Sequence, residues 1–287
     1  MADERVYVNG EWYAVDATAI SFDDRAFLFG DGVYEVVRVY DGRPFHLDAH
    51  LERLERSQRA ILIDPVPTAT LARVAQELVR EAEGLSDANI YFEISRGVNR
   101  RNHAIPIPAP APTVVVWCRA VSPMPDASVR AGIRAITVPD DRWAKCWIKT
   151  VNLLPNVLAK EKARQAGAQD ALFVRDGMAI EATSANLFAV FDGVLRTAPV
   201  TNYILPGITR QVVLELAAEL QIPVSLEPVP VEEMAVAAEV FITGTNTEVL
   251  PITTLDGRQV GPAIGPVAER LLQAYRERVG RSWATVT

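Results

Sequence analysis

Hydrophobic and polar residues alternate over short stretches of the chain, and turn-forming pairs separate these stretches. The run Val33 to Tyr40, for example, ends at a turn pair. Such runs joined by Asn-Gly or Asp-Gly are typical of β-hairpins, because these residues adopt the positive φ that a tight turn needs. The pairs are Asn9-Gly10, Asp41-Gly42, Asp176-Gly177, Asp192-Gly193 and Asp256-Gly257. The pattern therefore predicts several antiparallel hairpins.

Other segments repeat apolar residues every three or four positions, which is typical of amphipathic helices. We expect Thr68 to be the N-cap of the second of these helices and Gly84 to end it. The predicted helices are Leu47–Ile63, Thr68–Glu83, Asn152–Ala166, Thr209–Leu220 and Ile264–Val279. Because hairpins and helices are mixed without a regular alternation, the sequence favours an α+β fold over a doubly wound sheet.

A proline-rich break after the predicted strand Thr113–Arg119 is the best candidate for a domain boundary. We expect an N-terminal α+β domain of residues 1–120, a linker of residues 121–127 and a C-terminal domain of residues 128–287. The segment Ala104–Pro112 is too rich in proline for a helix or a central strand, so an ordered loop or arm is expected there.

The charge balance narrows the range of partners. The 287 residues include 29 basic and 36 acidic side chains, which leaves a net charge of -7. An acidic chain with scattered basic residues is a poor candidate for binding nucleic acid or an anionic membrane. The first residues do not resemble a signal peptide, and no apolar run approaches the roughly 18 residues of a membrane-spanning helix. We therefore expect a cytoplasmic protein.

Cysteine and histidine are scarce, with two and three residues respectively. Cys118 and Cys146 lie in apolar runs, so free thiols are expected rather than a disulfide framework or a zinc site. The histidines are too few to build a metal site of their own. The sequence predicts no metal centre.

Lys149 stands at the end of an apolar stretch, directly before a predicted helix. A lysine is costly to bury in its charged form, so an apolar setting favours the neutral amine. A neutral amine at the end of an element is the group that Schiff-base chemistry with a carbonyl cofactor requires. By itself the fragment also fits a lysine that reaches from a strand edge into solvent.

A glutamate and an asparagine, Glu181 and Asn186, flank a run of small residues that leads into an apolar strand. An acidic group beside a pyridine nitrogen keeps that nitrogen protonated, and the protonated ring is an electron sink that stabilises a carbanion at Cα. An ordinary polar turn is the alternative interpretation of this fragment.

Two further segments are suited to binding an anion. Pro206 and Gly207 open a helical pattern, so the first backbone N–H groups of that helix are available to a phosphate, and Thr209 adds a hydroxyl. The segment Thr243–Glu248 follows a predicted strand with several hydroxyls and a glycine. Each segment alone is a weak indication, because capped helices and threonine-rich turns are common.

Taken in order along the chain, these motifs resemble the class IV aminotransferases, which are enzymes of fold type IV that depend on pyridoxal 5'-phosphate. The resemblance covers nearly the whole chain and rests on Phe29–Val37, His50–Leu54, Ile148–Leu154, Glu181–Asn186 and Leu205–Arg210. It implies a smaller N-terminal α+β domain and a larger C-terminal domain with a barrel-like sheet, with the cofactor at their interface. It also implies a homodimer whose partner completes each site.

The same resemblance implies roles for individual residues. Lys149 would form the Schiff base with the cofactor, and Glu181 would pair with the pyridine nitrogen. Leu205 would lie against the ring, and Tyr34 would line the substrate side. The phosphate would be bound by the Arg53 side chain, the N–H groups of Ile208 and Thr209, and the hydroxyl of Thr245.

Within the family, the segment Arg96–His103 is similar to the Arg-x-His carboxylate trap of bacterial D-amino-acid aminotransferases, which gives Arg101 and His103 that role. An arginine fork pairs with a carboxylate through two hydrogen bonds. Arg100 beside Arg101 leaves the register open, and a solvated basic turn is the alternative.

The expected activity is transamination between a D-amino acid and a 2-oxo acid, by a ping-pong course through Lys149. D-Alanine or D-glutamate with pyruvate or 2-oxoglutarate is the expected type of substrate pair. The alternatives are an L-branched-chain aminotransferase or an R-selective amine transaminase. An aminodeoxychorismate lyase and a non-catalytic protein that binds the cofactor are more distant alternatives.

Overall fold

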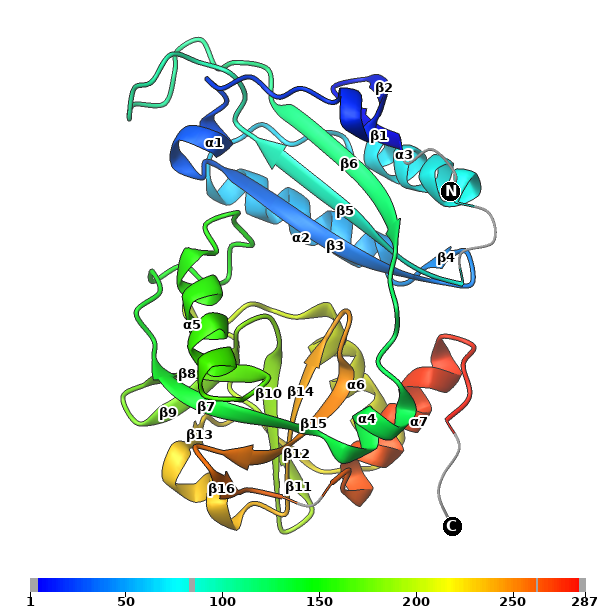
Figure 1. Cartoon of the computed structure of the whole chain (residues 1–287), viewed down its shortest axis with the longest axis vertical. Coiled ribbons are helices and arrows are strands. Elements are labelled where there is room, and N and C mark those ends of the chain that lie inside the picture. Colours follow the sequence, from blue (N-terminus) through cyan, green and yellow to red (C-terminus); the bar gives the residue numbers. More distant parts are fainter. Residues whose placement is uncertain (1–4, 83–85, 262, 284–287) are drawn as a thin grey trace. The chain divides into compact units, whose positions relative to one another are not determined.

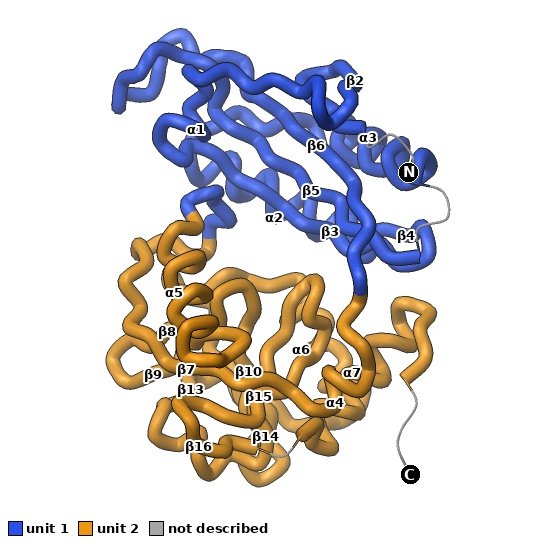
Figure 2. The backbone as a smooth tube through the Cα atoms, in the orientation of Figure 1, with its two compact units in different colours: residues 1–122, 148–152 blue, residues 123–147, 153–287 orange. Residues whose placement is uncertain are grey.

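The computed structural model of the chain describes residues 5–82, 86–261 and 263–283. The chain divides into two compact units (Figure 2). Unit 1 comprises residues 1–122 and 148–152, and unit 2 comprises residues 123–147 and 153–287. Residues 148–152 therefore belong to unit 1 although the chain on both sides of them belongs to unit 2. A single boundary at residues 121–127 does not describe this excursion.

Unit 1 is built on an antiparallel six-stranded sheet with the order β2-β1-β6-β5-β3-β4 (Figure 1). Two helices, α2 and α3, pack on one face of this sheet. Most side chains that alternate onto this face are apolar and buried, for example Val37 and Phe92, and the buried Glu35 is an exception. The elements are β1 (Arg5–Val8), β2 (Glu11–Ala14), η1 (Val15–Ala17), α1 (Arg25–Phe29), β3 (Gly32–Tyr40), β4 (Arg43–Pro44), α2 (Leu47–Ala60), α3 (Thr68–Glu81), β5 (Asp87–Ser95) and β6 (Thr113–Ala120).

Unit 2 is built on a mixed ten-stranded sheet, six of whose strands close into a ring. The path β10-β14-β15-β7-β8-β9 returns to β10, and the closing pair is Glu181 opposite Asn186. The barrel-like sheet expected for the C-terminal part is thus confirmed. The elements are α4 (Asp126–Ala131), β7 (Ile133–Pro139), α5 (Leu154–Gln165), β8 (Asp170–Arg175), β9 (Met178–Ala182), β10 (Asn186–Phe191), β11 (Val194–Arg196), α6 (Ile208–Glu219), β12 (Val224–Ser225), β13 (Val229–Pro230), η2 (Val231–Val236), β14 (Glu239–Gly244), β15 (Glu248–Leu255), β16 (Arg258–Gln259) and α7 (Pro266–Arg278).

Helices pack on this second sheet in two groups. Helix α5 packs against β7 and β8, where the small side chains of Ala159 and Ala163 join a buried cluster around Phe173. Helices α6 and α7 pack against each other and against β14. In the part of the chain that the structure describes, no helix has both the length and the apolar character needed to cross a membrane.

The five predicted hairpins are confirmed, and so is the α+β class. In each turn both residues have positive φ, for example 52° at Asp176 and 76° at Gly177. The five predicted helices also form, with ends that differ by a few residues. The N-cap prediction is wrong, because the carbonyl of Pro67 accepts the first helical hydrogen bonds and Thr68 is already helical. Gly84 lies outside the described residues.

Candidate functional site

Lys149 lies on a short stretch of chain that pairs with one edge of β3. Val33 and Thr150 form an antiparallel bridge, and the N–H of Tyr34 donates to the carbonyl oxygen of Lys149 at 3.0 Å. The N–H of Lys149 donates to Oγ of Ser57 on α2 at 3.4 Å. The backbone of Lys149 is therefore held at both its N–H and its carbonyl. Its Nζ lies 4.1 Å from the centroid of the Tyr34 ring, so the structure brings these two predicted residues together.

The end of the same stretch is held by Asn152. Its Nδ2 donates to the carbonyl oxygen of Gly30 at 2.8 Å. Gly30 follows α1 with a φ of 66°, a conformation that glycine adopts without strain. A Cβ atom at this position would lie 2.2 Å from Oδ1 of Asn152. A glycine is therefore required where the chain after Lys149 approaches the end of α1.

Glu35 follows Tyr34 on β3 and points to the opposite face of the sheet, where it is fully buried. Arg53 donates to it through Nε at 2.6 Å and through Nη2 at 2.9 Å, and Nδ1 of His50 lies 2.8 Å from Oε2. Burial raises the pKa of Glu35, but Arg53 and His50 outweigh burial and hold this pKa well below its usual range. Arg53, predicted to bind phosphate, is thus a buried cation fixed by a buried anion.

His50 completes this cluster as its neutral member. Burial lowers the pKa of His50, and the neighbouring Glu35 only partly opposes this effect. Arg53 and Lys149 lower the pKa further. The cluster thus contains one full positive and one full negative charge at neutral pH.

Tyr34 begins a row of stacked aromatic rings that crosses the sheet. Its ring centroid lies 5.6 Å from that of Tyr91, which lies 4.9 Å from that of Trp117. The hydroxyl of Tyr91 donates to Oε2 of Glu93 at 2.8 Å, and burial together with Glu93 raises the pKa of Tyr91. The row therefore starts beside Nζ of Lys149.

Arg101 and His103 come together around Phe29. The guanidinium carbon of Arg101 lies 5.3 Å from the centroid of the Phe29 ring, and the His103 ring lies at the same distance on centroids. Arg25 also lies against this ring and donates to the carbonyl oxygen of Asn102 at 2.6 Å. Arg101 and His103 are exposed. The two residues predicted for the carboxylate trap therefore stand on one anchored loop.

Glu181 stands at the pairing that closes the ring of strands in unit 2. Arg142 donates to Oε1 through Nη1 at 2.5 Å, while Nδ2 of Asn186 and the N–H of Leu205 each donate to Oε2 at 3.1 Å. All three partners are donors, as an ionised carboxylate requires, because it can only accept hydrogen bonds. Burial raises the pKa of Glu181, and Arg142 opposes this rise. The predicted partner of a pyridine nitrogen is thus a buried, oriented carboxylate with an increased affinity for a proton.

The start of α6 is tied to Glu181 through Asn186. Nδ2 of Asn186 also donates to the carbonyl oxygen of Leu205 at 2.9 Å. A Cβ atom at Gly207 would lie 2.0 Å from Oδ1 of Asn186. Helix α6 begins at Ile208, so the N–H groups of its first turn have no acceptor within the helix. Ile208 and Thr209 are buried. This helix end can therefore bind an anion, as predicted from the Pro-Gly pair.

The end of β14 and the turn after it contain two buried hydroxyls for which the described residues provide no partner, those of Thr243 and Thr247. The predicted residue, Thr245, is half-buried beside them. Thr243 pairs with Asn186 across β14 and β10, so both side chains lie on one face of the sheet. Buried hydroxyls are normally hydrogen-bonded. A phosphate at this turn would supply the missing acceptors.

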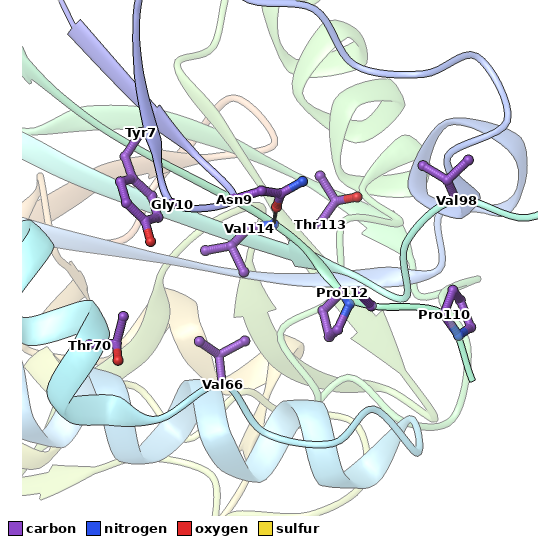
Figure 3. Close-up of a pocket in the computed structure, with 11 residues that line it drawn as sticks. Tyr7, Asn9, Gly10, Val66, Thr70, Val98, Pro110, Pro112, Thr113 and Val114 are labelled. Atoms are coloured by element: carbon purple, nitrogen blue, oxygen red, sulfur yellow. Dashed lines mark hydrogen bonds between the residues drawn. The ribbon is translucent and has the colours of Figure 1, made fainter. Parts of the chain in front are cut away.

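Two cavities of unit 1 are not lined by any residue predicted for the site. The larger has a volume of about 550 Å³ and lies between the β1–β2 turn, the region of Val66 and Thr70, and residues 110–112 (Figure 3). Its described lining has no charged side chain, and Oδ1 of Asn9 already accepts the N–H of Val114 at 2.7 Å. The smaller, of about 280 Å³, is lined partly by Asp24 and Glu93.

Several residues near the predicted ones were given no role from the sequence. Glu35, Ser57, Arg142 and Asn186 bond predicted residues directly. His50 and Asp140 bond partners of predicted residues, and Thr243 and Thr247 lie two positions from Thr245. For Glu35 a signal existed, because a charged residue within an apolar strand needs a buried partner. For Arg142 no local pattern existed, because its partner Glu181 lies 39 positions further along the chain.

Comparison with known proteins gives a consistent result. The family described as amino-transferase class IV matches residues 32–255. The chain is 38% identical to the D-alanine aminotransferase of Staphylococcus haemolyticus over 277 residues, which is 96% of this chain and 98% of that protein. It is also 38% identical to the D-alanine aminotransferase of Bacillus licheniformis, over 96% of this chain and 97% of that protein.

Solved structures resemble the chain over a similar extent. The T.th. branched-chain amino acid aminotransferase with pyridoxamine 5'-phosphate has a TM-score of 0.88 and 29% identity, and covers 96% of this chain and 94% of that one. The branched-chain amino acid aminotransferase from Escherichia coli has a TM-score of 0.86 and 28% identity, and covers 98% and 96%.

Proposed function

The chain belongs to the class IV aminotransferases, and we propose that it transfers the amino group of a D-amino acid to a 2-oxo acid. The donor is of the D-alanine or D-glutamate type, and the acceptor is pyruvate or 2-oxoglutarate. The observation that carries the proposal is the near full-length identity of 36–38% with proteins named D-alanine aminotransferase. The reaction follows a ping-pong course, in which the first product leaves before the second substrate binds.

Pyridoxal 5'-phosphate is the cofactor, and the chain offers groups that match each of its functional parts. We assign Lys149 to the aldehyde, Glu181 to the ring nitrogen and Leu205 to the face of the ring. For the phosphate we assign the Arg53 side chain, the N–H groups of Ile208 and Thr209, and the hydroxyl of Thr245. The donor set fits, because helix N–H groups, hydroxyls and an arginine are the usual ligands of a phosphate. The unpartnered hydroxyls of Thr243 and Thr247 support the same assignment.

When bound, the cofactor supplies an electron sink for the electrons of the broken Cα–H bond. The protein has to move the proton. Nζ of Lys149 would take the Cα proton as general base and, as general acid, would deliver it to the C4′ carbon of the cofactor. Backbone hydrogen bonds to Tyr34 and Ser57 restrict where this amine can reach. Tyr34 lines the substrate side of the amine.

Arg101 and His103 bind the substrate carboxylate and thereby select which enantiomer of the substrate reacts. Lys149 works from one side, so only an enantiomer whose Cα–H bond points to that side reacts. The position of the carboxylate decides which enantiomer meets this condition. Two observations support this role. Both side chains lie against the ring of Phe29, and Arg25 holds their loop by a hydrogen bond to the carbonyl oxygen of Asn102.

Substitution of the lysine tests the chemical centre of the proposal. Lys149→Ala should abolish transamination, the visible absorption band of lysine-bound cofactor and the bond that borohydride reduces. Lys145→Ala is the matched control, because Lys145 is exposed four residues earlier and should leave all three readouts unchanged. Transamination retained in Lys149→Ala would exclude this role for the lysine.

A panel of amino donors tests the substrate assignment. Wild-type protein should use D-alanine or D-glutamate with pyruvate or 2-oxoglutarate as acceptor. Arg101→Ala should lower kcat/KM for D-alanine by about a hundredfold, in line with the loss of a charge-assisted hydrogen-bonded pair. It should affect R-1-phenylethylamine, which has no carboxylate, much less. Arg100→Ala is the matched control, and a larger effect there would move the role to Arg100.

A branched-chain aminotransferase is the second candidate function, favoured by the TM-scores of 0.86 to 0.88 with structures of that name. L-Leucine with 2-oxoglutarate distinguishes the two candidates. Turnover of L-leucine without turnover of any D-amino acid would replace the first candidate by the second.

We further propose that the protein acts as a cytoplasmic homodimer. Support for a dimer comes from α5, where Leu154, Val157 and Leu158 are 66%, 58% and 53% exposed although they are apolar. Support for a reducing compartment comes from Cys118 and Cys146, which are free thiols. Sedimentation of the holoenzyme tests the dimer, since a monomer at the assay concentration would contradict it.

A further inference from the structure

A buried arginine of unit 2, Arg142, joins two carboxylates. Its Nε and Nη2 donate to the two oxygens of Asp140 at 2.8 and 3.1 Å, and its Nη1 donates to Glu181 at 2.5 Å. Nη2 also donates to the carbonyl oxygen of Tyr203 at 3.1 Å. The side chains of Asp140, Arg142 and Glu181 are 0%, 6% and 7% exposed. The guanidinium is therefore fixed, and it fixes one oxygen of Glu181.

Other groups enclose this cluster of Asp140, Arg142 and Glu181. The guanidinium of Arg142 lies 4.1 Å from the centroid of the Phe173 ring. Arg175 donates through Nη2 to the carbonyl oxygen of Asp140 at 2.9 Å, and its Nε lies 3.5 Å from Oδ2 of the same residue. The side chain of Arg175 is 27% exposed, so solvent screens this ion pair. Burial raises the pKa of Cys146 to about 11, so its thiol is neutral near pH 7.

Sharing Arg142 determines how much of its positive charge reaches Glu181. An arginine paired with a single carboxylate neutralises it, whereas Arg142 is divided between Asp140 and Glu181. Asp140, Arg142 and Glu181 by themselves carry one negative charge in excess. The partly exposed Arg175 offsets this charge through Asp140, and none of its described contacts reaches Glu181. Glu181 is therefore held in place without being neutralised. Its three donors occupy three of about four acceptor sites of a carboxylate, which leaves one site for a further N–H.

We propose that Arg142 and Asp140 are positioning residues for Glu181. Arg142 orients the carboxylate, and Asp140 prevents Arg142 from neutralising it, so that Glu181 acts as the counter-ion of the protonated ring nitrogen of the cofactor. The inference rests on the proposed function, in which Glu181 pairs with this nitrogen. It assigns a role to two buried charged residues that reach the proposed cofactor partner, Glu181, through hydrogen bonds: Asp140 bonds Arg142, and Arg142 bonds Glu181.

The test measures the protonation of the ring nitrogen directly. Holoenzyme is reconstituted with cofactor labelled with ¹⁵N in the ring, and its ¹⁵N NMR shift is recorded near neutral pH. The wild-type nitrogen should be protonated. Asp140→Asn removes a negative charge without changing shape, and Arg142→Lys keeps the charge but loses the fork. Both should move the shift toward the unprotonated value, as should Glu181→Gln.

Kinetics give a second readout and identify the route of action. Asp140→Asn and Arg142→Lys should lower kcat about tenfold and change KM for the amino donor by less than about twofold. Combined with Glu181→Gln, neither should lower kcat beyond the loss from Glu181→Gln alone, because both act through Glu181. Additive losses would overturn the proposal.

Arg276→Lys is the matched control for a merely structural effect. Arg276 also joins two carboxylates, Asp126 and Glu248, is 11% exposed and lies against the ring of Trp283. Within the described part of the chain, these contacts include no residue assigned to the site. The substitution should leave the ¹⁵N shift and kcat unchanged.

The outcomes separate this inference from the proposed function. A wild-type protein with neither lysine-bound cofactor nor turnover of any amino donor would remove the proposed function itself. An active wild-type enzyme with an unprotonated nitrogen would overturn the inference alone. The same conclusion would follow from a protonated nitrogen that stays protonated in both variants. If Arg142→Lys does not fold, the isosteric Asp140→Asn decides the question.

Discussion

Two buried carboxylates, Glu35 in unit 1 and Glu181 in unit 2, both accept hydrogen bonds from an arginine, yet their pKa values shift in opposite directions. Arg53 gives Glu35 two N–H groups, one to each oxygen. Arg142 donates only one hydrogen bond to Glu181, through Nη1, and donates to Asp140 through Nε and Nη2. The carboxylate with an arginine of its own remains charged, and the one that shares an arginine gains affinity for a proton.

The difference corresponds to two uses of a buried charge. Glu35 fixes Arg53, which needs a constant charge if it is to bind a phosphate. If Glu181 pairs with a protonated ring nitrogen, as we propose, a strongly neutralised carboxylate would be a poor partner for it. The number of cationic donors per carboxylate, rather than burial alone, separates the two cases.

The largest effect expected from this comparison is on stability. Glu35→Gln removes the buried carboxylate that pairs with the buried charge of Arg53, so the free energy of unfolding should fall by about 3–5 kcal/mol. Glu181→Gln should cost less, about 1–2 kcal/mol, because Arg142 keeps Asp140 as its partner. Urea denaturation of the cofactor-free proteins measures both values, and equal losses would break the comparison.

The pH dependence of stability should differ in sign. The folded-state pKa of Glu35 is lowered from the ordinary value of 4.5, so its contribution is present above that value and is lost as the pH falls through the folded pKa. The folded-state pKa of Glu181 is raised, so its contribution is present below the ordinary value and is lost as the pH rises through the folded pKa.

Unfolding at several pH values checks this sign. The difference in stability between wild type and Glu35→Gln should grow as the pH rises from the acid side toward neutrality. The difference between wild type and Glu181→Gln should shrink over the same change. Slopes of the same sign for both pairs would contradict the assignment.

A smaller effect is expected at Thr243, which lies in the same cross-strand row as Glu181 and Asn186. Thr243→Val removes a buried hydroxyl that has no partner among the described residues, so the cofactor-free protein should be at least as stable as wild type. If this hydroxyl binds the cofactor phosphate, the affinity for the cofactor should fall about tenfold, the equivalent of roughly 1.4 kcal/mol. An unchanged affinity, measured by equilibrium dialysis, would remove Thr243 from the phosphate site.

The smallest effect is expected at Ser57, beside the backbone of Lys149. Its hydrogen bond with the Lys149 N–H is long, at 3.4 Å, and the neighbouring strand pairing already holds the lysine. Ser57→Ala should therefore cost about 0.5 kcal/mol of stability and lower kcat less than twofold. A tenfold loss of kcat would show that Ser57 contributes more to holding Lys149 than the pairing with β3.

Local chemistry made much of the fold predictable from the sequence. The five turn pairs, Asp176-Gly177 among them, need positive φ at two successive residues, and few residue types allow this. The helices followed from apolar spacing in the same way. Even here the start of α3 was misjudged, because Pro67 rather than Thr68 caps it.

Contacts between distant segments were not predictable from one sequence. The pairing of Val33 with Thr150 and the bond from Arg142 to Glu181 join positions that no local pattern relates. Residue type indicated that Lys149 and Glu181 were chemically suited to a cofactor. It could not indicate that Glu181 would share its arginine, because that depends on which strands meet in the ring.

The excursion of residues 148–152 has a consequence for dissecting the molecule. The polypeptide passes from one unit to the other at 122–123, 147–148 and 152–153. A fragment ending at residue 122 would lack the segment that pairs with β3, and its exposed strand edge would invite aggregation. A synthetic peptide with the sequence of residues 148–152 should restore solubility to such a fragment. Genetic separation of the two halves by a single cut is therefore the wrong design.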